Sequence, residues 1–423
     1  MTERAPTLTG YRERLAEARL KSLKDQLSAL MIVGPRAVGK TTTAERYAST
    51  VVRLNVPAEA AAYKADADSA LLGLDEPVLL DEWQEVPDVL RAVARSVNAD
   101  PRPGRYLLTG SVRAEIEHAV WPGTGRLQRL AIFPMTVREQ RGLRHPSGFL
   151  DALLAGELPA APRNHVSLRE YVELALVGGF PYPALVLRDP AARATWFDDY
   201  SSDLLTHDVE HAEESRTRRR DPFRLRRYFE AYALNSAGSC DHRTIYVSAG
   251  IRRETANAYN ELLQRLFVIE EVQPWMTNRL SRLVHQPKRY VVEPALLANL
   301  LRLDADGILR DGDMLGRVLD TFVAAQLRPE LAVSTQRPRL HHLRSEGGRH
   351  EIDLVIELGG GRVIGIEVKA TAAPRTHDAR HLVWLRDALG RRFLAGVVLH
   401  TGPRSIPLEE RITAAPISSL WTD

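Results

Sequence analysis

Residues 34–43 read GPRAVGKTTT, and this stretch restricts the fold more than any other part of the sequence. It satisfies the phosphate-loop pattern G-x-x-x-x-G-K-[ST] in full. An apolar segment, SALMIV, precedes it, and a segment with helical character, TTTAERYA, follows it. A strand, a glycine-rich loop and a helix in this order predict a nucleotide-binding α/β unit.

The loop residues have separate expected roles. Glycine at Gly34 and Gly39 lets backbone N–H groups surround a phosphate without a Cβ in the way. Lys40 is expected to neutralise the β- and γ-phosphates, and the Thr41 hydroxyl to bind Mg²⁺. ATP and Mg²⁺ are therefore the expected cofactors. The predicted nucleotide contacts are Gly34, Pro35, Arg36, Ala37, Val38, Gly39, Lys40, Thr41 and Thr42.

A second apolar segment, VLLDEWQ (78–84), ends in two acids, Asp81 and Glu82. In phosphate-loop enzymes an acid at such a strand end holds Mg²⁺. A carboxylate one residue further on can polarise the attacking water. We therefore predict Asp81 as a metal ligand and Glu82 as a catalytic residue.

A third apolar segment, YLLTGS (106–111), ends in hydroxyl groups. Thr109 or Ser111 fits the position of a γ-phosphate sensor. Arg113 and Arg126 follow, and either is a candidate to reach a γ-phosphate in the same or a neighbouring subunit. A homo-oligomer is therefore an open alternative.

Composition limits the class of protein. The 423 residues are 44% apolar and 26% charged, which is ordinary for folded domains. The net charge is only +3, but a pI near 9.0 permits an anionic partner. Cys240 is the only cysteine, which fits a reducing compartment and excludes an intrachain disulfide. The charged N-terminus is unlike a signal peptide, and no apolar run is long enough to span a membrane. We expect a cytoplasmic protein with no membrane partner.

The predicted fold class is α/β. Strands alternate with helices up to about residue 140, which favours a parallel sheet. Helical segments with Pro/Gly breaks follow, and the chain then returns to strands. The predicted units are a P-loop α/β domain (1–140), a helical linker (141–235), a winged helix-turn-helix (236–300) and a C-terminal α/β domain (301–423).

Residues 243–275 predict a winged helix, because a short helix, a tight turn, a longer helix and a strand occur in that order. Arg252 and Arg253 stand at the start of the longer helix. An arginine cluster just upstream can neutralise several phosphates; it consists of Arg216, Arg218, Arg219, Arg220, Arg224, Arg226 and Arg227. DNA is the expected partner, and interdomain packing is the alternative.

EIDLVIELGGGRVIGIEVKA (351–370) predicts a β-hairpin. If Leu358 pairs with Arg362 across the glycine turn, Asp353 lies opposite Glu367. Alternation of side chains then places Glu367 and Lys369 on one face, together with Asp353. The opposite, apolar face is expected to comprise Ile352, Leu354, Ile356, Ile364, Ile366 and Val368.

Two carboxylates and an ammonium on one surface suit metal-assisted phosphodiester hydrolysis. The carboxylates would hold Mg²⁺, and the lysine would position or activate a water. Asp320, in GRVLDTFVAAQL, is a further candidate ligand from the preceding helix. The predicted catalytic residues here are Asp353, Glu367 and Lys369, with Asp320, Asp353 and Glu367 as metal ligands. A cross-strand salt bridge is the alternative.

The order of these motifs resembles that of prokaryotic AAA+-type ATPases with a C-terminal domain of unknown function, number 4143. The matching stretches include GPRAVGKTT, LLDEWQEVPDVLRAV, YLLTGS, GTGRLQRLAIFPMTVRE, KRYVVEPALLANLL and EIDLVIE…GIEVKA. The resemblance implies an AAA+-like domain, a helical segment, a winged helix and a restriction-endonuclease-like PD-(D/E)XK unit. It also implies a nucleotide contact for Arg126, in the GR pair.

The sequence therefore predicts an ATP-binding and ATP-hydrolysing protein. Its nucleotide state would control a DNA-engaging, nuclease-like C-terminal half, which is a candidate for Mg²⁺-dependent cleavage. The alternative is a nucleotide-switched DNA- or protein-binding regulator whose nuclease-like fold is catalytically inactive.

Overall fold

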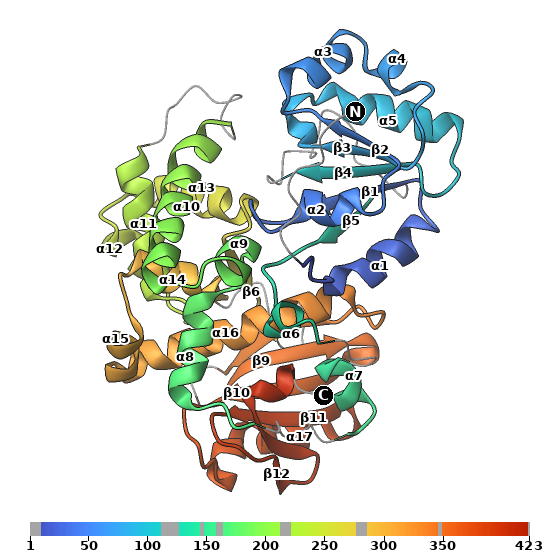
Figure 1. The fold of residues 1–423 in the computed structure, drawn as a ribbon. Helices are drawn as coiled ribbons and strands as arrows, with labels where there is room; N and C mark the ends of the chain where they lie inside the picture. Colours follow the sequence, from blue (N-terminus) through green and yellow to red (C-terminus); the bar gives the residue numbers. More distant parts are fainter. Residues whose placement is uncertain are drawn as a thin grey trace.

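The computed structural model describes residues 10–110, 127–143, 148–157, 164–211, 221–275, 286–345 and 349–421. Along the chain, a parallel sheet with its helices is followed by a helical region and then by a mixed sheet (Figure 1). The predicted α/β class is confirmed. Within these ranges no helix combines the length and apolarity needed to cross a membrane.

The N-terminal sheet has five parallel strands in the order β2-β3-β4-β1-β5. They are β1 (Ala29–Val33), β2 (Thr50–Arg53), β3 (Val78–Asp81), β4 (Tyr106–Gly110) and β5 (Leu127–Ala131). The helices are α1 (Leu15–Lys24), α2 (Lys40–Glu45), α3 (Pro57–Ala65), α4 (Ala67–Leu71), η1 (Trp83–Glu85) and α5 (Asp88–Ala99). The β-α-β alternation of the sequence thus gives the expected parallel sheet.

Alternate residues of the central strands belong to two separate hydrophobic clusters, one on each face of the sheet. Met31 and Leu80 pack with α3, α4 and α5, whereas Ile32 and Leu79 pack with α1 and α2. Because both faces are covered, β1, β3 and β4 are buried along their whole length. Their polar residues are therefore confined to the strand ends, where the loops begin.

The middle of the chain is mainly helical. It contains α6 (Val137–Arg141), α7 (Phe149–Leu154), α8 (Leu168–Val177), α9 (Pro181–Leu185), α10 (Pro190–His211), α11 (Pro222–Leu234), α12 (His242–Ser248), α13 (Arg253–Arg265), β6 (Ile269–Val272), β7 (Lys288–Val291), α14 (Pro294–Leu300), α15 (Ala305–Arg310) and α16 (Gly312–Val333). Strands β6 and β7 pair antiparallel directly after α12 and α13. Two helices followed by two paired strands match the element order expected from the sequence, and the winged helix itself stays a prediction.

The C-terminal sheet has six strands in the order β12-β13-β11-β10-β9-β8. Its elements are β8 (Arg339–Arg344), β9 (Glu351–Leu358), η4 (Gly359–Gly361), β10 (Arg362–Val368), η5 (Thr376–Ala379), α17 (Arg380–Leu389), η6 (Gly390–Arg392), β11 (Phe393–His400), β12 (Ile406–Glu409), β13 (Ile412–Pro416) and η7 (Ile417–Leu420). Strand β11 runs parallel to β10 and β13, and the other neighbours are antiparallel. Helix α16 packs on one face and α17 on the other.

The predicted hairpin register is correct. Arg362 pairs with Leu358, and the ladder continues to the pair of Ile366 and Leu354. One further step places Glu367 beside Asp353, as the sequence predicts.

The predicted apolar face is wrong at Ile352. This side chain packs with Val355 and Val363, on the face opposite to that of Leu354. Against β8 the register shifts, so that two residues of β9, Asp353 and Leu354, lie opposite one residue of β8, His342. A bulge of this kind reverses the alternation at the start of the strand.

One hydrophobic cluster unites the helical region with the C-terminal sheet. It includes Tyr228 of α11, Leu262 of α13, Phe322 of α16 and Ile356 of β9. Residues on both sides of positions 235 and 300 belong to this cluster, so the packing does not divide the chain at either position. The predicted domain boundaries there stay predictions. The N-terminal sheet has its own clusters on its two faces.

Helix α6 connects the N-terminal sheet to α16 (Figure 1). The backbone N–H of Val137 donates to Gln326 Oε1 at 2.8 Å. The guanidinium of Arg138 lies 3.3 Å from the Glu330 carboxylate, and both side chains are buried. The two halves are thus joined by buried polar contacts as well as by chain connectivity.

Candidate functional site

The phosphate loop between β1 and α2 needs glycine at two positions. Gly34 has a φ of +152°, and a Cβ there would lie 2.1 Å from the main-chain oxygen of Ile132, just after β5. Gly39 has a φ of +92° immediately before α2. Residues that carry a Cβ rarely adopt either of these backbone conformations. The sequence pattern thus reflects a real steric requirement.

Lys40, the first residue of α2, is buried inside the loop. Its Nζ donates to the main-chain oxygens of Gly34 at 3.1 Å and Pro35 at 2.8 Å. The ammonium therefore lies within the curve of the loop. A phosphate oxygen is a stronger acceptor for it than a neutral carbonyl, because both partners are then charged.

Asp81, at the end of β3, links the loop to β4. Its Oδ1 accepts a hydrogen bond from Thr41 Oγ1 at 2.7 Å and another from Thr109 Oγ1. Strand β4 lies between β1 and β3, so Thr109 comes next to both. Carboxylate and hydroxyl oxygens are hard ligands of the kind that Mg²⁺ prefers. The three residues predicted from three separate segments therefore meet at one edge of the sheet.

Glu82 follows in a left-handed conformation with φ of +52°. Its Oε2 accepts a hydrogen bond from Gln84 Nε2. Trp83 is buried, and a Cβ on Gly110 would lie 2.8 Å from its Nε1. The indole thus fixes the DEWQ turn against the tip of β4, beside Thr109. This structural role of Trp83 is not apparent from the sequence.

Arg14 is a residue of the nucleotide site that the sequence reasoning missed. Its Nη1 donates to the main-chain oxygen of Val38 in the loop at 2.8 Å. Its Nε lies 3.1 Å from Glu139 Oε1, and its Nη2 donates to the Phe133 oxygen. Arg14 and Glu139 are both buried. The side chain therefore ties the loop backbone to α6.

The remaining residues predicted to contact the nucleotide differ in their exposure to solvent. Val38 and Pro35 are buried, whereas Arg36, Ala37 and Thr42 are exposed along the outer side of the loop. Three further candidates, Ser111, Arg113 and Arg126, lie outside the described residues.

The second candidate site lies at the open end of the β9–β10 hairpin. Lys369 Nζ is 2.8 Å from Glu367 Oε2. Asp353 Oδ2 accepts a hydrogen bond from the backbone N–H of Val368 at 2.9 Å. Burial raises the pKa of Glu367 to about 8, and the neighbouring Asp353 adds to this effect. The predicted triad is thus gathered at one place.

Lys288, on β7, is also part of this site and was not predicted. Its Nζ lies 2.5 Å from Asp320 Oδ2 and 3.2 Å from Asp353 Oδ1. Tyr290 donates to Asp320 Oδ1 at 2.9 Å. Burial opposes the charge of Lys288, yet the carboxylates of Asp320 and Asp353 raise its pKa well above the ordinary value. An ammonium therefore lies between two of the three predicted metal ligands.

The site carboxylates have different pKa values because their surroundings differ. Burial raises the pKa of Asp320 to about 6, although Lys288 opposes the shift. Burial acts in the same direction on Asp353, but Lys288 and Lys369 outweigh it and lower its pKa. The Oε1 atom of Glu367 is buried without a hydrogen-bond partner among the described residues.

The two sites differ in how well they suit a divalent cation. Across the described ranges, no group of three or more His, Cys, Asp or Glu side chains is arranged to hold a metal ion. Mg²⁺ bound with a nucleotide needs only one or two protein oxygens, so Thr41 and Asp81 fit it. In the hairpin site, the orphan oxygen of Glu367 fits a cation, but Lys288 already supplies one positive charge to Asp320 and Asp353.

The helix-turn-helix unit presents basic residues to solvent. Arg252 and Arg253 are exposed at the start of α13, and Arg227 is exposed on α11. Arg224 lies 3.3 Å from the carboxylate of Asp221 in an exposed pair. The other predicted members of the cluster are Arg226, half-buried, and Arg216, Arg218, Arg219 and Arg220, which lie outside the described residues.

The strand order and the loop define a P-loop nucleotide-binding protein, and comparison with known families agrees. Residues 26–140 match the AAA domain, residues 168–307 the domain of unknown function DUF8612, and residues 315–420 the domain of unknown function DUF4143. The resemblance drawn from the sequence is thus confirmed. The chain has an AAA domain at its N-terminus and a DUF4143 domain at its C-terminus.

Two mycobacterial proteins are similar to this chain along most of its length. The chain is 26% identical over 414 residues to the uncharacterized proteins Rv2008c of Mycobacterium tuberculosis and Mb2031c of Mycobacterium bovis, over 97% of this chain and 84% of each relative. Among solved structures, it is similar to the Walker-type ATPase PaBY2304 of Pyrococcus abyssi. That match has a TM-score of 0.40 and 13% identity, over 68% of this chain and 94% of that chain.

Proposed function

We propose that the protein binds and hydrolyses ATP at the phosphate loop, with Mg²⁺ held by Thr41 and Asp81. The observation that carries this proposal is the cluster of Thr41, Asp81 and Thr109 beside the buried Lys40. Mg²⁺, when bound, neutralises charge on the phosphoryl oxygens. Glu82, one residue beyond Asp81, accepts a proton from the attacking water.

ATP turnover by the purified protein tests this directly. Steady release of phosphate is expected, with a loss of at least about 100-fold for Glu82→Gln, since a general base contributes on that scale. Lys40→Ala should also abolish tight ATP binding, whereas Glu82→Gln should retain it. Glu85→Gln, in the same turn, is the matched control. An inactive wild-type protein would refute the proposal.

We further propose that the nucleotide state acts on the C-terminal half through α6. Arg14 contacts both the loop carbonyl of Val38 and Glu139 of α6. Arg138, which precedes Glu139 in α6, forms an ion pair with Glu330 of α16. A shift of the loop on nucleotide binding therefore has a continuous buried path to α16, the helix that carries Asp320.

The C-terminal half is proposed to engage nucleic acid through the helix-turn-helix unit and its exposed arginines. A gel shift or anisotropy measurement with a salt titration tests this, because phosphate contacts weaken steeply as salt rises. Arg252→Glu/Arg253→Glu should weaken binding, and the exposed pair Glu254→Gln/Glu261→Gln on the same helix should not.

Two functions remain for the hairpin site, and separate observations favour each. A binding-only role is favoured by Lys288, whose ammonium forms ion pairs with both Asp320 and Asp353 where a metal ion would lie. Hydrolysis is favoured by the unpartnered oxygen of Glu367 and by Lys369 beside it. Nuclease assays on plasmid, linear and single-stranded DNA with Mg²⁺ or Mn²⁺ separate them. Cleavage that Asp353→Ala and Lys369→Ala abolish would establish hydrolysis.

A further inference from the structure

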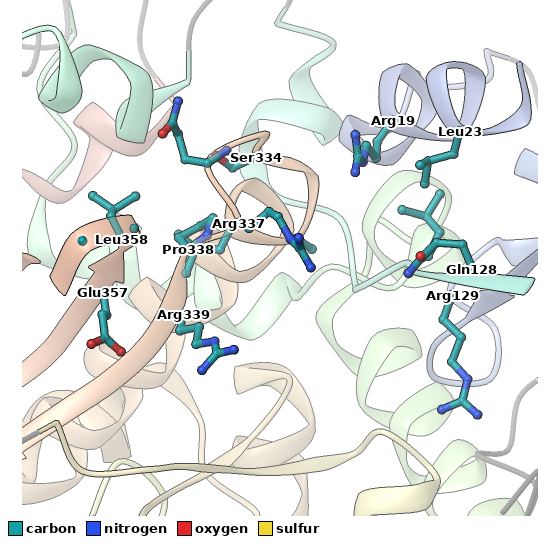
Figure 2. Close-up of a pocket in the computed structure, with 16 residues that line it drawn as sticks. Arg19, Leu23, Gln128, Arg129, Ser334, Arg337, Pro338, Arg339, Glu357 and Leu358 are labelled. Carbon is teal, nitrogen blue, oxygen red and sulfur yellow. The ribbon is translucent and has the colours of Figure 1, made fainter. Parts of the chain in front are cut away.

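A cavity of about 860 Å³ lies between the N-terminal sheet and the C-terminal sheet. One wall comes from α1 and β5, and the other from the segment 334–339 and the tip of the β9–β10 hairpin (Figure 2). Neither the phosphate loop nor the hairpin triad lines it. The cavity is therefore distinct from both sites described above.

The two walls are held together by apolar packing. Leu23 of α1 belongs to the hydrophobic cluster on the α1 side of the sheet, and Val333, at the end of α16, packs against that cluster. Leu23 also lines the cavity, as does Leu331 of α16. The hollow is thus part of the packed junction between the two halves.

The cavity is strongly basic. Its described lining residues include Arg19, Arg129, Arg337 and Arg339, and the one carboxylate among them is that of Glu357. Figure 2 shows Arg337 extending from one wall toward the wall that carries Arg19. Arg129, Arg337 and Arg339 are exposed to solvent.

The positive charge of these arginines exceeds the local counter-charge, because Glu357, opposite Arg339 in the β8–β9 ladder, is the one acid among the described lining residues. Glu357 is buried and lies 3.3 Å from His341 Nε2. In the described part of the chain, none of the four arginines forms a salt bridge, although many arginines elsewhere do. Like charges gathered in a hollow repel one another and concentrate anions. A bound polyanion would relieve this repulsion.

The lining chemistry indicates what kind of anion fits. Guanidinium groups bind phosphate oxygens with two parallel hydrogen bonds. Gln128, Gln336 and Ser334 add neutral polar groups to the walls. No aromatic ring is among the described lining residues, so bases have no aromatic stacking partner there. The cavity suits recognition of a phosphate backbone without reading of bases.

We propose that this arginine cavity binds the phosphodiester backbone of nucleic acid, independently of sequence. The inference rests on the proposed engagement of nucleic acid by the C-terminal half and adds a second contact surface to it. Strand β9 connects the cavity with the hairpin site, since Glu357 and Asp353 are four residues apart on it. Four residues of a β-strand span about 14 Å. Along the axis of a duplex, roughly four phosphates of one strand cover the same distance.

The test measures binding of fluorescein-labelled single-stranded DNA, duplex DNA and RNA by anisotropy over a salt series. The variant Arg129→Glu/Arg337→Glu removes one arginine from each wall. We expect affinity to fall by about tenfold or more, and the slope of log K against log[salt] to decrease by about two, one for each lost phosphate contact. Arg302→Glu, exposed between α14 and α15, is the control and should bind as wild type does.

The possible results are distinguishable. If wild type binds and the double variant binds equally well, the cavity proposal is wrong and the proposed engagement of nucleic acid stands. If wild type binds none of the three probes, both fail. If tripolyphosphate displaces the oligonucleotide from the Lys40→Ala variant at an equal phosphate concentration, a free polyanion is the ligand and the nucleic-acid assignment is wrong.

A second measurement does not depend on the stability of the variants. Benzoylphenylalanine at the exposed Gln336, which lines the cavity, should photocrosslink to bound oligonucleotide. The same probe at the exposed Leu72, in the N-terminal domain away from the cavity lining, should not. Equal crosslinking at both positions would contradict the proposal.

Discussion

The ammonium of Lys288 lies 2.5 Å from the carboxylate of Asp320, and neither side chain is more than 8% exposed. Lys288 also contacts the half-buried Asp353, so one buried cation pairs with two carboxylates. Burial of this kind is tolerated only when the charges are paired. Lys288 therefore stabilises the arrangement that a divalent cation would stabilise in a metal-dependent hydrolytic site.

Replacement of Lys288 by methionine should expose this dependence. The change leaves Asp320 and Asp353 close together without a positive partner other than Lys369, and breaking a buried ion pair costs roughly 3–5 kcal/mol. We expect a marked loss of thermal stability. We also expect Mg²⁺ at millimolar concentration to raise the melting temperature of Lys288→Met more than that of wild type.

The matched control is Lys24→Met, which breaks a more exposed pair with Asp25. Such surface pairs contribute only about 0–1 kcal/mol, so little change is expected. A Lys288→Met protein as stable as wild type would contradict the proposed role of the ammonium. If Mg²⁺ raised the melting temperatures of Lys288→Met and wild type by the same amount, the link to metal binding would be contradicted.

The local features of both sites follow from the sequence. The phosphate loop occupies consecutive positions, and the hairpin register follows from a single glycine turn and period-two alternation. Asp81 and Thr109 are predictable because parallel strands all end at one edge of the sheet. In each case a short pattern is sufficient to place the side chain.

Contacts between distant segments do not follow from such patterns. Lys288 and its partner Asp353 are 65 positions apart, and Arg14 and Glu139 are 125 apart. Lys288 is one of two adjacent basic residues at the start of a short strand, and nothing local distinguishes it from a solvated lysine. The bulge at Ile352 likewise depends on pairing with β8, which periodicity within β9 cannot indicate.

Thr109 should be required for ATP turnover because its hydroxyl helps to orient Asp81. Thr109→Val preserves the shape of the side chain but removes the donor. We expect phosphate release to fall about tenfold or more, with a smaller effect on ATP binding, which Lys40 and the loop backbone dominate. Thr195→Val, at an exposed position of α10, is the control. Unchanged turnover for Thr109→Val would exclude this role.

Arg14 should couple the stability of the phosphate loop to α6. Arg14→Met removes the contacts with Val38, Phe133 and Glu139 and leaves Glu139 buried without its charged partner. A loss of roughly 3–5 kcal/mol in the free energy of unfolding is expected, together with weaker ATP binding. Urea denaturation and nucleotide titration measure the two effects.

Arg91→Met is the control for Arg14, because Arg91 contacts Asp88 on an exposed surface. Its effect should be about 0–1 kcal/mol. If Arg14→Met is destabilised but binds ATP as wild type does, Arg14 supports the fold without influencing the loop.

The raised pKa of Glu367 predicts a dependence of stability on pH. This carboxyl titrates near 4.5 when the chain is unfolded, whereas burial and Asp353 raise its pKa to about 8 in the fold. Between these values the folded state binds the extra proton, so its stabilising contribution is complete below pH 4.5 and is lost as pH rises toward 8. Glu367→Gln retains the shape without titrating. Its melting temperature relative to wild type should therefore increase between pH 5 and pH 8.5, whereas exposed Glu351→Gln should show no such trend. A constant difference between Glu367→Gln and wild type would show that Glu367 is ionised in the fold throughout this range.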